Sequence, residues 1–287
     1  MVSEKLHKAR CNKEKNIFII VPTVEGREHF LDKFIKSLDK VKFNYDLIVI
    51  RQYKISEYHV ENVNILNIKD FGASKARNIG FKYICSKIND DDLIFFPDDD
   101  CYFIDEFYDS NIFNFDLSLI NIFSPGGLRL GFEDGNLKLK SNLFYRINCP
   151  RFFVKKKFFQ QIFFNENLGP GSIIPAVEET EFFYRLFTSN SKLSIYSSNI
   201  NIYHPHEVYD DSKNFNYSYS QGVLLRYLYY NDKVYFLNYS VVFLRPFISL
   251  FLNFLKIEKR IFYSNRLKGI LKGLLSNDYI KIERRIR

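Results

Sequence analysis

The nine residues from Leu93 to Cys101, LIFFPDDDC, join a short apolar run to three consecutive acidic residues. The apolar run predicts a buried strand, and three adjacent carboxylates repel one another unless solvent or a cation relieves them. Because side chains alternate along an extended chain, we expect Asp98 and Asp100 to share one face and Asp99 to point away. Two such carboxylates suit Mg²⁺ or Mn²⁺ that carries substrate phosphates. The alternative is a solvated acidic turn that follows a strand.

The segments before this strand predict a largely parallel α/β sheet. The predicted elements are strands at 16–23, 46–50 and 63–68 and helices at 28–38 and 74–85. Alternating strands and helices are typical of α/β proteins. Ligands bind such sheets beyond the carboxyl ends of the strands, which is where Pro22 and Asp98 fall. Further on, residues 151–159 predict a strand that leads into a helix, and 124–127 and 133–136 predict turns.

Composition bounds the class of protein. The chain has 287 residues, 46% of them hydrophobic, which is enough for one large or two modest domains. Its four cysteines are widely spaced and form no CxxC pair, which argues against a zinc site or a disulfide scaffold and favours reduced thiols in a cytosol. The first 16 residues are charged and lack an apolar core, so we expect no signal peptide.

Positive charge is concentrated at the C-terminal end. Of the net charge of +8, residues 256–287 carry +7, because they hold ten basic and three acidic residues. The rest of the chain is nearly neutral, which argues against a nucleic-acid binder and for a local anionic partner.

The preceding stretch, residues 234–255, is strongly apolar but contains Arg245 and Pro246. An arginine at mid-membrane is costly, so we expect helices that lie on an anionic membrane surface rather than a span. The alternative is a helical subdomain that packs onto the core. We therefore predict two parts, residues 1–233 and residues 234–287.

A second acidic cluster follows a loop rich in glycine and proline. Gly169–Ser172 are Gly-Pro-Gly-Ser, and Glu178 and Glu179 come soon after, at the predicted start of a helix. Acidic residues are favoured at a helix N-terminus by its dipole, which is the structural explanation. A carboxylate at this place is also suited to serve as a general base for an attacking hydroxyl. Glu181 and Arg185 are predicted to form a structural i,i+4 pair.

Histidines follow the last predicted strand in the order Tyr203-His204-Pro205-His206. Two histidines two positions apart on an extended chain share a face. In a chain with an acidic candidate metal site, either His204 or His206 is a candidate for a further ligand, although a lone histidine is more often structural.

The order of these motifs resembles that of GT-A glycosyltransferases. VPTVE after the first strand, then FGASKARNIGF, FPDDD, GPGS, EETEFFYR and a late histidine are most similar to glycosyltransferase family 2, over about residues 16–210. The spacing also resembles that of the beta-1,4-galactosyltransferase family. The resemblance implies a GT-A fold, a mixed α/β sheet flanked by helices, with amphipathic helices added at the C-terminus.

The resemblance also implies roles for individual residues. The nucleotide-sugar residues would be Pro22, Thr23, Glu25, Arg27, Arg77, Asn78, Asp98 and Asp99. The metal ligands would be Asp100, His204 or His206, and Asp98, and the base would be Glu179, with Glu178 as the competitor. We expect the acceptor near Gly171, Ser172 and Tyr217, with Tyr219 and Gln221 as further candidates.

Two positions depart from the family pattern. The base position holds Glu rather than the commoner Asp, which leaves Glu178 and Glu179 hard to separate. The second strand ends in Ile50-Arg51-Gln52, where family 2 often has an acidic residue, so recognition of the nucleotide base is expected to differ.

These observations predict an inverting glycosyltransferase that depends on Mn²⁺ or Mg²⁺. It would move a sugar, with galactose or N-acetylgalactosamine suggested by the resemblance, from a UDP-sugar to a glycan or lipid-linked glycan of a bacterial capsule or O-antigen. It would be cytoplasmic and peripheral on the inner face of the cell membrane. The alternatives are a nucleotidyltransferase that forms nucleotide sugars and an inactive GT-A protein that binds a membrane surface. The loop VPTVEGRE disfavours the first, since it has one glycine and an acidic residue where such enzymes have a glycine-rich basic loop.

Overall fold

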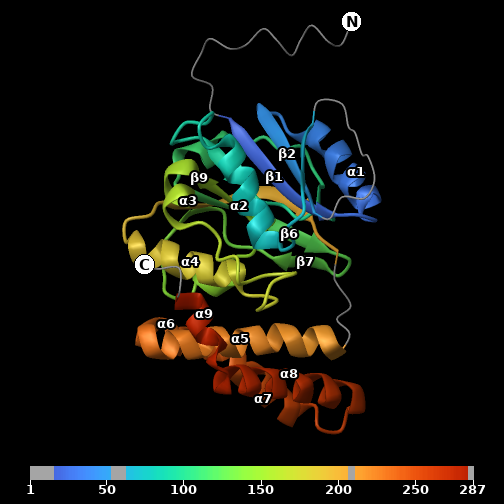
Figure 1. Cartoon of the computed structure of the whole chain (residues 1–287), viewed down its shortest axis with the longest axis vertical. Helices are drawn as coiled ribbons and strands as arrows, with labels where there is room; N and C mark the ends of the chain where they lie inside the picture. The colour runs from blue at the N-terminus through green and yellow to red at the C-terminus, as the bar shows by residue number, and fades with distance from the viewer. Residues whose placement is uncertain (1–15, 53–62, 206–210, 284–287) are drawn as a thin grey trace, which may run out of the picture.

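The computed structural model describes residues 16–52, 63–205 and 211–283 and arranges them in two layers. A sheet with helices on its faces forms the first layer, here called the sheet layer, and a group of helices below it forms the second, the helical layer (Figure 1). The segments before and after the acidic triplet fold as the sequence predicts, into a mixed α/β structure.

One sheet of ten strands organises the described residues. Its strand order is β3-β2-β1-β4-β9-β6-β10-β5, with β7 paired to β6 and β8 paired to β10. The first strands are β1 (Ile17–Val24), β2 (Tyr45–Gln52), β3 (Asn64–Ile68), β4 (Leu93–Phe95) and β5 (Tyr102–Phe103). The later strands are β6 (Leu117–Ser124), β7 (Gly127–Leu130), β8 (Gly135–Leu137), β9 (Phe152–Lys155) and β10 (Ile195–Tyr203). Neighbours from β3 to β4 run parallel, whereas β9 is antiparallel to both β4 and β6, so the sheet is mixed.

Both faces of the sheet are covered. Strand β1 sends Ile17, Ile19 and Val21 to the core beneath α1 (Glu28–Ser37). Its alternate residues, Phe18 and Ile20, enter the core on the opposite face. That second core is shared with α2 (Ala73–Ile84), α3 (Lys156–Ile162) and α4 (Glu178–Ser189). This two-residue period on a strand buried on both faces is what a parallel sheet requires.

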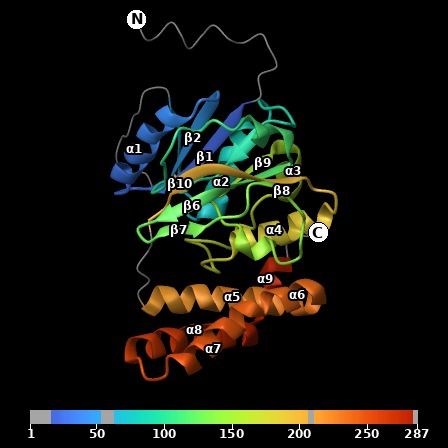
Figure 2. The ribbon, with the colours of Figure 1, turned by 180° about the vertical axis from the view of Figure 1, so that it is seen from behind.

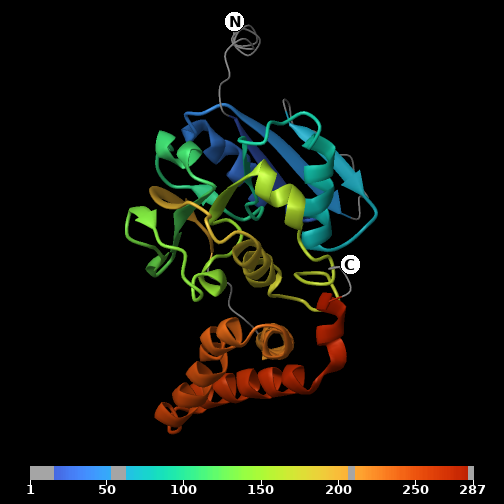
Figure 3. The same ribbon diagram turned by 90° about the vertical axis from the view of Figure 1, so that its left-hand side faces the viewer.

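The helical layer consists of α5 (Asp211–Asn231), α6 (Lys233–Tyr239), α7 (Val241–Leu252) and α8 (Ile257–Leu275). Figures 2 and 3 show α5 and α8 side by side below the sheet layer, with α7 at the outer side. Helices α5 and α8 cross at a very short distance. A Cβ added at Gly222 of α5 would lie 2.1 Å from the carbonyl oxygen of Ile270 on α8, so this crossing requires glycine.

The end of the described chain returns to the sheet layer. After α8 the short helix α9 (Ile280–Glu283) rises beside the loop that precedes α4 (Figure 3). The side-chain amides of Asn165 and Asn167 donate to the carbonyl oxygens of Ile282 (3.3 Å) and Lys281 (2.9 Å). These bonds tie the C-terminal end of the helical layer to the sheet layer.

The predicted boundary at residue 233 stays a prediction, and the helical layer itself begins earlier, at α5. Among the described residues, one helical segment, Lys233–Leu252, is long and apolar enough to cross a membrane by length and composition alone. It consists of two helices, α6 and α7, that meet at Ser240. Length and composition do not distinguish a span from helices that lie on a surface.

Candidate active site

A cavity with a volume of about 1090 Å³ lies between the two layers. The sheet layer contributes the ends of β1 and β2, the acidic triplet after β4, the start of α4 and His204 after β10. The helical layer contributes one face each of α5, α7 and α8. The cavity thus opens at the carboxyl ends of the parallel strands, where α/β sheets bind ligands.

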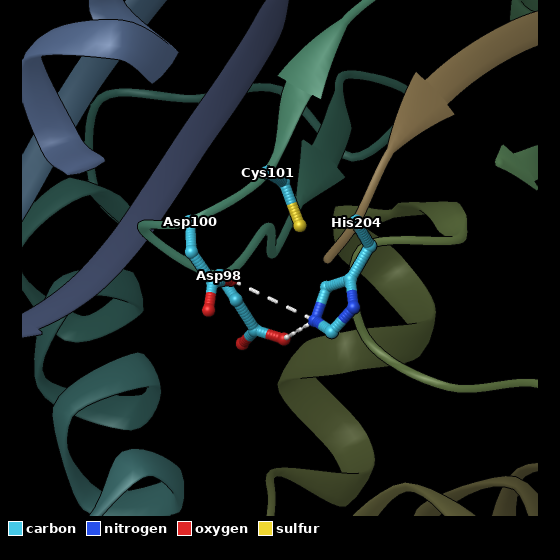
Figure 4. A group of neighbouring side chains, drawn as sticks. All are labelled: Asp98, Asp100, Cys101 and His204. Carbon is cyan, nitrogen blue, oxygen red and sulfur yellow. Dashed lines mark ion pairs between the residues drawn. The ribbon is translucent and has the colours of Figure 1, made fainter. Parts of the chain in front are cut away.

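The acidic triplet divides its side chains between two directions. Strand β4 ends at Phe95 and residues 98–100 form a turn, in which the Cys101 amide donates to the Asp98 carbonyl oxygen (3.2 Å). The Asp98 and Asp100 carboxylates approach His204 Nε2 at 3.5 and 3.6 Å (Figure 4). The two outer carboxylates therefore share a direction, as the sequence predicts, although the chain is turned here rather than extended.

Asp99 has a different environment. Its carboxylate accepts a hydrogen bond from the Thr23 hydroxyl (2.6 Å) and forms an ion pair with Arg27 Nη2 (2.6 Å). The same Arg27 nitrogen reaches Asp100 Oδ2 at 2.9 Å. Asp99 and Thr23 are buried, so Asp99 joins the triplet to β1. Asp99 also lines the cavity, and its expected role at the nucleotide-sugar stays a prediction.

Four side chains form a group that fits a metal ion. The ligand atoms of Asp98, Asp100, Cys101 and His204 all lie within 4.8 Å of one another. Asp100 Oδ1 is buried and accepts no hydrogen bond from any described residue, so this oxygen is left for a cation. The other candidate, His206, lies outside the described residues.

Chemistry favours three of the four ligands. Burial raises the pKa of the Cys101 thiol well above its usual value, and a neutral thiol is a poor ligand for a hard cation. Asp98, Asp100 and His204 supply oxygen and imidazole donors, which suit Mn²⁺ better than Mg²⁺, since Mg²⁺ prefers oxygen alone.

The pKa values of the two outer aspartates are shifted in opposite directions. Burial alone would raise the pKa of Asp98, but His204 and then Arg77 hold it below its ordinary value. Burial and the neighbouring Asp98 raise the pKa of Asp100. A cation bound between Asp98 and Asp100 would stabilise the ionised form of both carboxylates, because its positive charge would offset the cost of burying them.

Arg77 links two acidic residues of the site, Asp98 and Glu178. It extends from α2, is buried, and pairs with Asp98 Oδ1 (2.7 Å) and less closely with Glu178 Oε1 (3.6 Å). Its Nη1 makes the contact with Glu178, and its Nε is buried and donates no hydrogen bond to any described residue. Arg77 also lines the cavity, which is consistent with its predicted place near the nucleotide-sugar.

The two glutamates at the start of α4 have different environments. Glu178 is buried against Gly169 and Arg77, and burial followed by repulsion from Glu179 raises its pKa well above the ordinary value. Glu179 is only half-buried, accepts a hydrogen bond from the Cys149 amide (3.3 Å) and lines the cavity.

Several predicted residues line the cavity and several do not. Those that do include Pro22, Thr23, Arg27, Arg77, Gly171, Tyr217 and Gln221. Asn78 does not, because it is buried and exchanges hydrogen bonds with the backbone of Phe164 (2.9 and 3.0 Å). The Ser172 hydroxyl is used within its own loop, where it donates to the Gly169 carbonyl oxygen (2.6 Å).

Two further candidates lie elsewhere. Glu25 is exposed and does not line the cavity. The Tyr219 hydroxyl bonds to Ser276 and Asp278, so it fastens α5 to the turn after α8.

Sequence reasoning missed other lining residues. Gln52 ends β2 and accepts a hydrogen bond from the Gly72 amide (2.7 Å). Its place at the carboxyl end of a strand was the available signal. Arg245 and Arg266 of the helical layer were missed as well. The interruption of the apolar stretch by Arg245 was the signal for the first of them.

A comparison of folds gives a match over nearly the whole chain. The structure of residues 1–349 of TarS from S. aureus, a GT-A-like glycosyltransferase, matches with a TM-score of 0.56 at 16% identity. The match covers 91% of this chain and 81% of that one. The protein has a GT-A-like fold. No protein-family model matches the sequence, and no curated protein matches it. The predicted likeness to beta-1,4-galactosyltransferases is not shown.

Proposed function

We propose that the protein is an inverting, metal-dependent glycosyltransferase that uses a UDP-sugar. The observation that carries the proposal is the convergence of Asp98, Asp100 and His204 at the carboxyl edge of the sheet in a GT-A-like fold. The resemblance of the ordered motifs to family 2 supports the same activity.

The balance of charge supports a cation and a phosphate-bearing donor. Five acidic side chains line the sheet side of the cavity, and Arg27 and Arg77 are the cations beside them. Asp98, Asp100 and His204 would hold the metal, and a bound divalent cation would stabilise the charge that develops on the leaving diphosphate. Arg77, which lines the cavity, would add positive charge for the same phosphates.

The environments of the two glutamates favour Glu179 as the base. A base must be ionised and able to reach the proton that it removes. Burial and the neighbouring Glu179 raise the pKa of Glu178, which disfavours its ionised form, and its carboxyl lies 3.6 Å from Arg77 Nη1. Glu179 is more accessible, and it would accept the proton of an acceptor hydroxyl as that oxygen attacks the anomeric carbon opposite the diphosphate. Attack from that side inverts the anomeric centre.

For the acceptor we propose a glycan of a bacterial capsule or O-antigen, with galactose or N-acetylgalactosamine as the transferred sugar. The acceptor would lie between the loop that contains Gly171 and the helical layer, where Tyr217 lines the cavity. Aromatic rings on such a wall suit the apolar faces of sugars.

We further propose that the outer face of the helical layer lies on the inner surface of the cell membrane. Large apolar side chains of this layer are exposed, among them Leu237, Phe247, Phe251, Leu252, Leu255 and Ile257. Lys256, Lys259 and Arg260 lie next to them in sequence. An apolar face with basic neighbours suits an anionic bilayer surface. A lipid-linked acceptor would then meet the cavity at the membrane.

Binding of UDP tests the proposed activity. We would titrate UDP by calorimetry into wild type, Asp100→Asn and the surface control Asp134→Asn, with Mn²⁺ and with EDTA. We expect metal-dependent binding that Asp100→Asn weakens by at least about 100-fold, since a buried ligand charge is lost, and that Asp134→Asn leaves unchanged. Binding of another nucleoside diphosphate in place of UDP would redirect the donor assignment. Absence of all nucleotide binding would contradict the proposal and favour an inactive GT-A protein.

A further inference from the structure

The two walls of the cavity carry opposite charge. The sheet wall is acidic, with the aspartate triplet and the two glutamates of α4. In the described part of the helical wall no lining residue is acidic, and three are basic: Lys213, Arg245 and Arg266. They come from three different helices, α5, α7 and α8, so their meeting on one wall follows from the packing and not from one basic stretch.

Helix α7 has two faces of different character. The residues that line the cavity, Val241, Val242, Arg245, Pro246 and Ser249, recur at helical spacing on one face. The residues of the other face, Leu244, Phe247, Ile248, Phe251 and Leu252, are exposed. Arg245 is thus directed to the cavity by the same helix that presents apolar side chains outward. It forms no ion pair with any acidic residue that the structure describes.

Arg266 of α8 lines the same cavity as Arg245, and a residue of α5 holds its side chain in place. Its Nη2 donates to Gln221 Oε1 (3.2 Å), and Gln221 itself lines the cavity from α5. Lys213 lies one turn before Tyr217 on α5, with Nζ 5.9 Å from the centre of that ring. An aromatic ring beside Lys213 and a glutamine beside Arg266, on a wall that Arg245 also lines, combine a surface for a sugar with charges for an oxyanion.

We propose that Lys213, Arg245 and Arg266 bind a phosphate group carried by the acceptor. The inference rests on the proposed function, since it states which class of acceptor the helical wall would recognise opposite the donor site. Three cations match the charge of a phosphate better than that of a single carboxylate, and guanidinium groups bind phosphate through two parallel hydrogen bonds. The donor diphosphate is satisfied on the opposite wall, where Asp98, Asp100 and His204 would hold its metal.

A sugar phosphate is the probe for this site. Calorimetry would compare glucose 1-phosphate with glucose, with UDP and Mn²⁺ saturating the donor site. The variants are Arg245→Gln, Arg245→Lys and, as a control of equal charge change on the exposed side of α8, Lys272→Gln. We expect wild type to bind glucose 1-phosphate more tightly than glucose. Arg245→Gln should weaken the sugar phosphate about tenfold, Arg245→Lys less, and Lys272→Gln not at all.

Three results would overturn the inference: equal affinity for glucose and glucose 1-phosphate, no effect of Arg245→Gln, or a loss of UDP affinity in that variant instead. If wild type binds no UDP, the proposed function fails, and the same titration without UDP and metal still tests the anion site. The two failures are therefore distinguishable.

Two further probes separate the possible sources of the phosphate. Phosphatidylcholine vesicles that contain polyprenyl phosphate would be compared with vesicles that contain polyprenol. A preference for polyprenyl phosphate that Arg245→Gln removes supports the inference with a lipid-borne phosphate. A preference for glucose 1-phosphate alone supports it with a phosphate inside the glycan. No preference in either pair would overturn it.

Discussion

The sheet layer buries its apolar side chains, whereas the helical layer leaves many of its apolar side chains exposed. In the sheet layer, β1 buries both faces, and Ile20 is fully buried. Of the twelve residues of α7, all of which the structure describes, only Pro246 is buried, and Phe251 is 82% exposed. The sheet layer thus has a closed core of its own, whereas the helical layer presents apolar side chains to a further surface.

The same difference divides the cavity. On the sheet wall, carboxylates are held by neighbouring cations and hydroxyls, as in the contacts of Asp99 with Thr23 and Arg27. On the helical wall, the described lining residues include three basic residues and no acidic one. The comparison suggests that the sheet wall is organised before a donor binds, and that the helical wall is completed by the acceptor.

The largest expected effect concerns chemistry on the sheet wall. Glu179→Gln keeps the size of the side chain and removes its basicity, so we expect the rate of sugar transfer to fall about 10²- to 10⁴-fold. Affinity for UDP should stay within about twofold. The exposed Glu25→Gln is the matched control and should keep both. Unchanged transfer in Glu179→Gln would remove this residue from the base position.

The next effect concerns the crossing of α5 and α8. Gly222→Ala would place a methyl group 2.1 Å from a backbone carbonyl oxygen, so we expect a loss of about 1–3 kcal/mol in the free energy of unfolding. Chemical denaturation would measure it. Gly126→Ala is the control, because a Cβ there meets nothing within 4 Å. Equal stability of the two variants would contradict the close crossing.

A third prediction sharpens the contrast in apolar exposure. Replacing Phe251 by Ser removes a large exposed side chain from α7, and we expect binding to anionic vesicles to weaken about tenfold or more. Tyr108 in the sheet layer is similarly exposed, at 75%. Vesicle sedimentation should therefore show no change for Tyr108→Ser. The same weakening in both variants, or in neither, would contradict a membrane surface for α7.

The smallest effect is a dependence of stability on pH. The pKa of Glu178 is raised in the folded protein, so its contribution to stability is present below the unfolded-state pKa and is lost as pH rises through the folded-state pKa. Glu178→Gln should remove this part of the decline, which is at most about 1.4 kcal/mol per pH unit. Denaturation from pH 5 to pH 9 would test it. Parallel curves for wild type and variant would show that Glu178 is ionised throughout.

Much of the sheet layer follows from local sequence patterns. The strand before Asp98, the strand that ends beyond Pro22 and the helix after Gly72 lie within one or two residues of their predicted ranges, because apolar period and glycine positions determine them locally. The direction of Asp98 and Asp100 also followed from alternation along the chain.

The remainder depends on tertiary packing. The family pattern gave no means to see that Asn78 bonds to Phe164 or that Asp99 bonds to Thr23, since those partners are far apart in sequence. Likewise, Arg245 interrupts an apolar stretch in the sequence, but only the packing of α7 against α8 directs it to the cavity.

The central claim is that Asp98, Asp100 and His204 hold the donor's metal. Crystals grown with UDP and MnCl₂ would locate manganese by its anomalous scattering. The account predicts one peak within about 2.0–2.4 Å of Asp100 and His204, next to the diphosphate, and no peak in Asp100→Asn crystals. Bound UDP with no manganese at these residues, or manganese at another site, would contradict it.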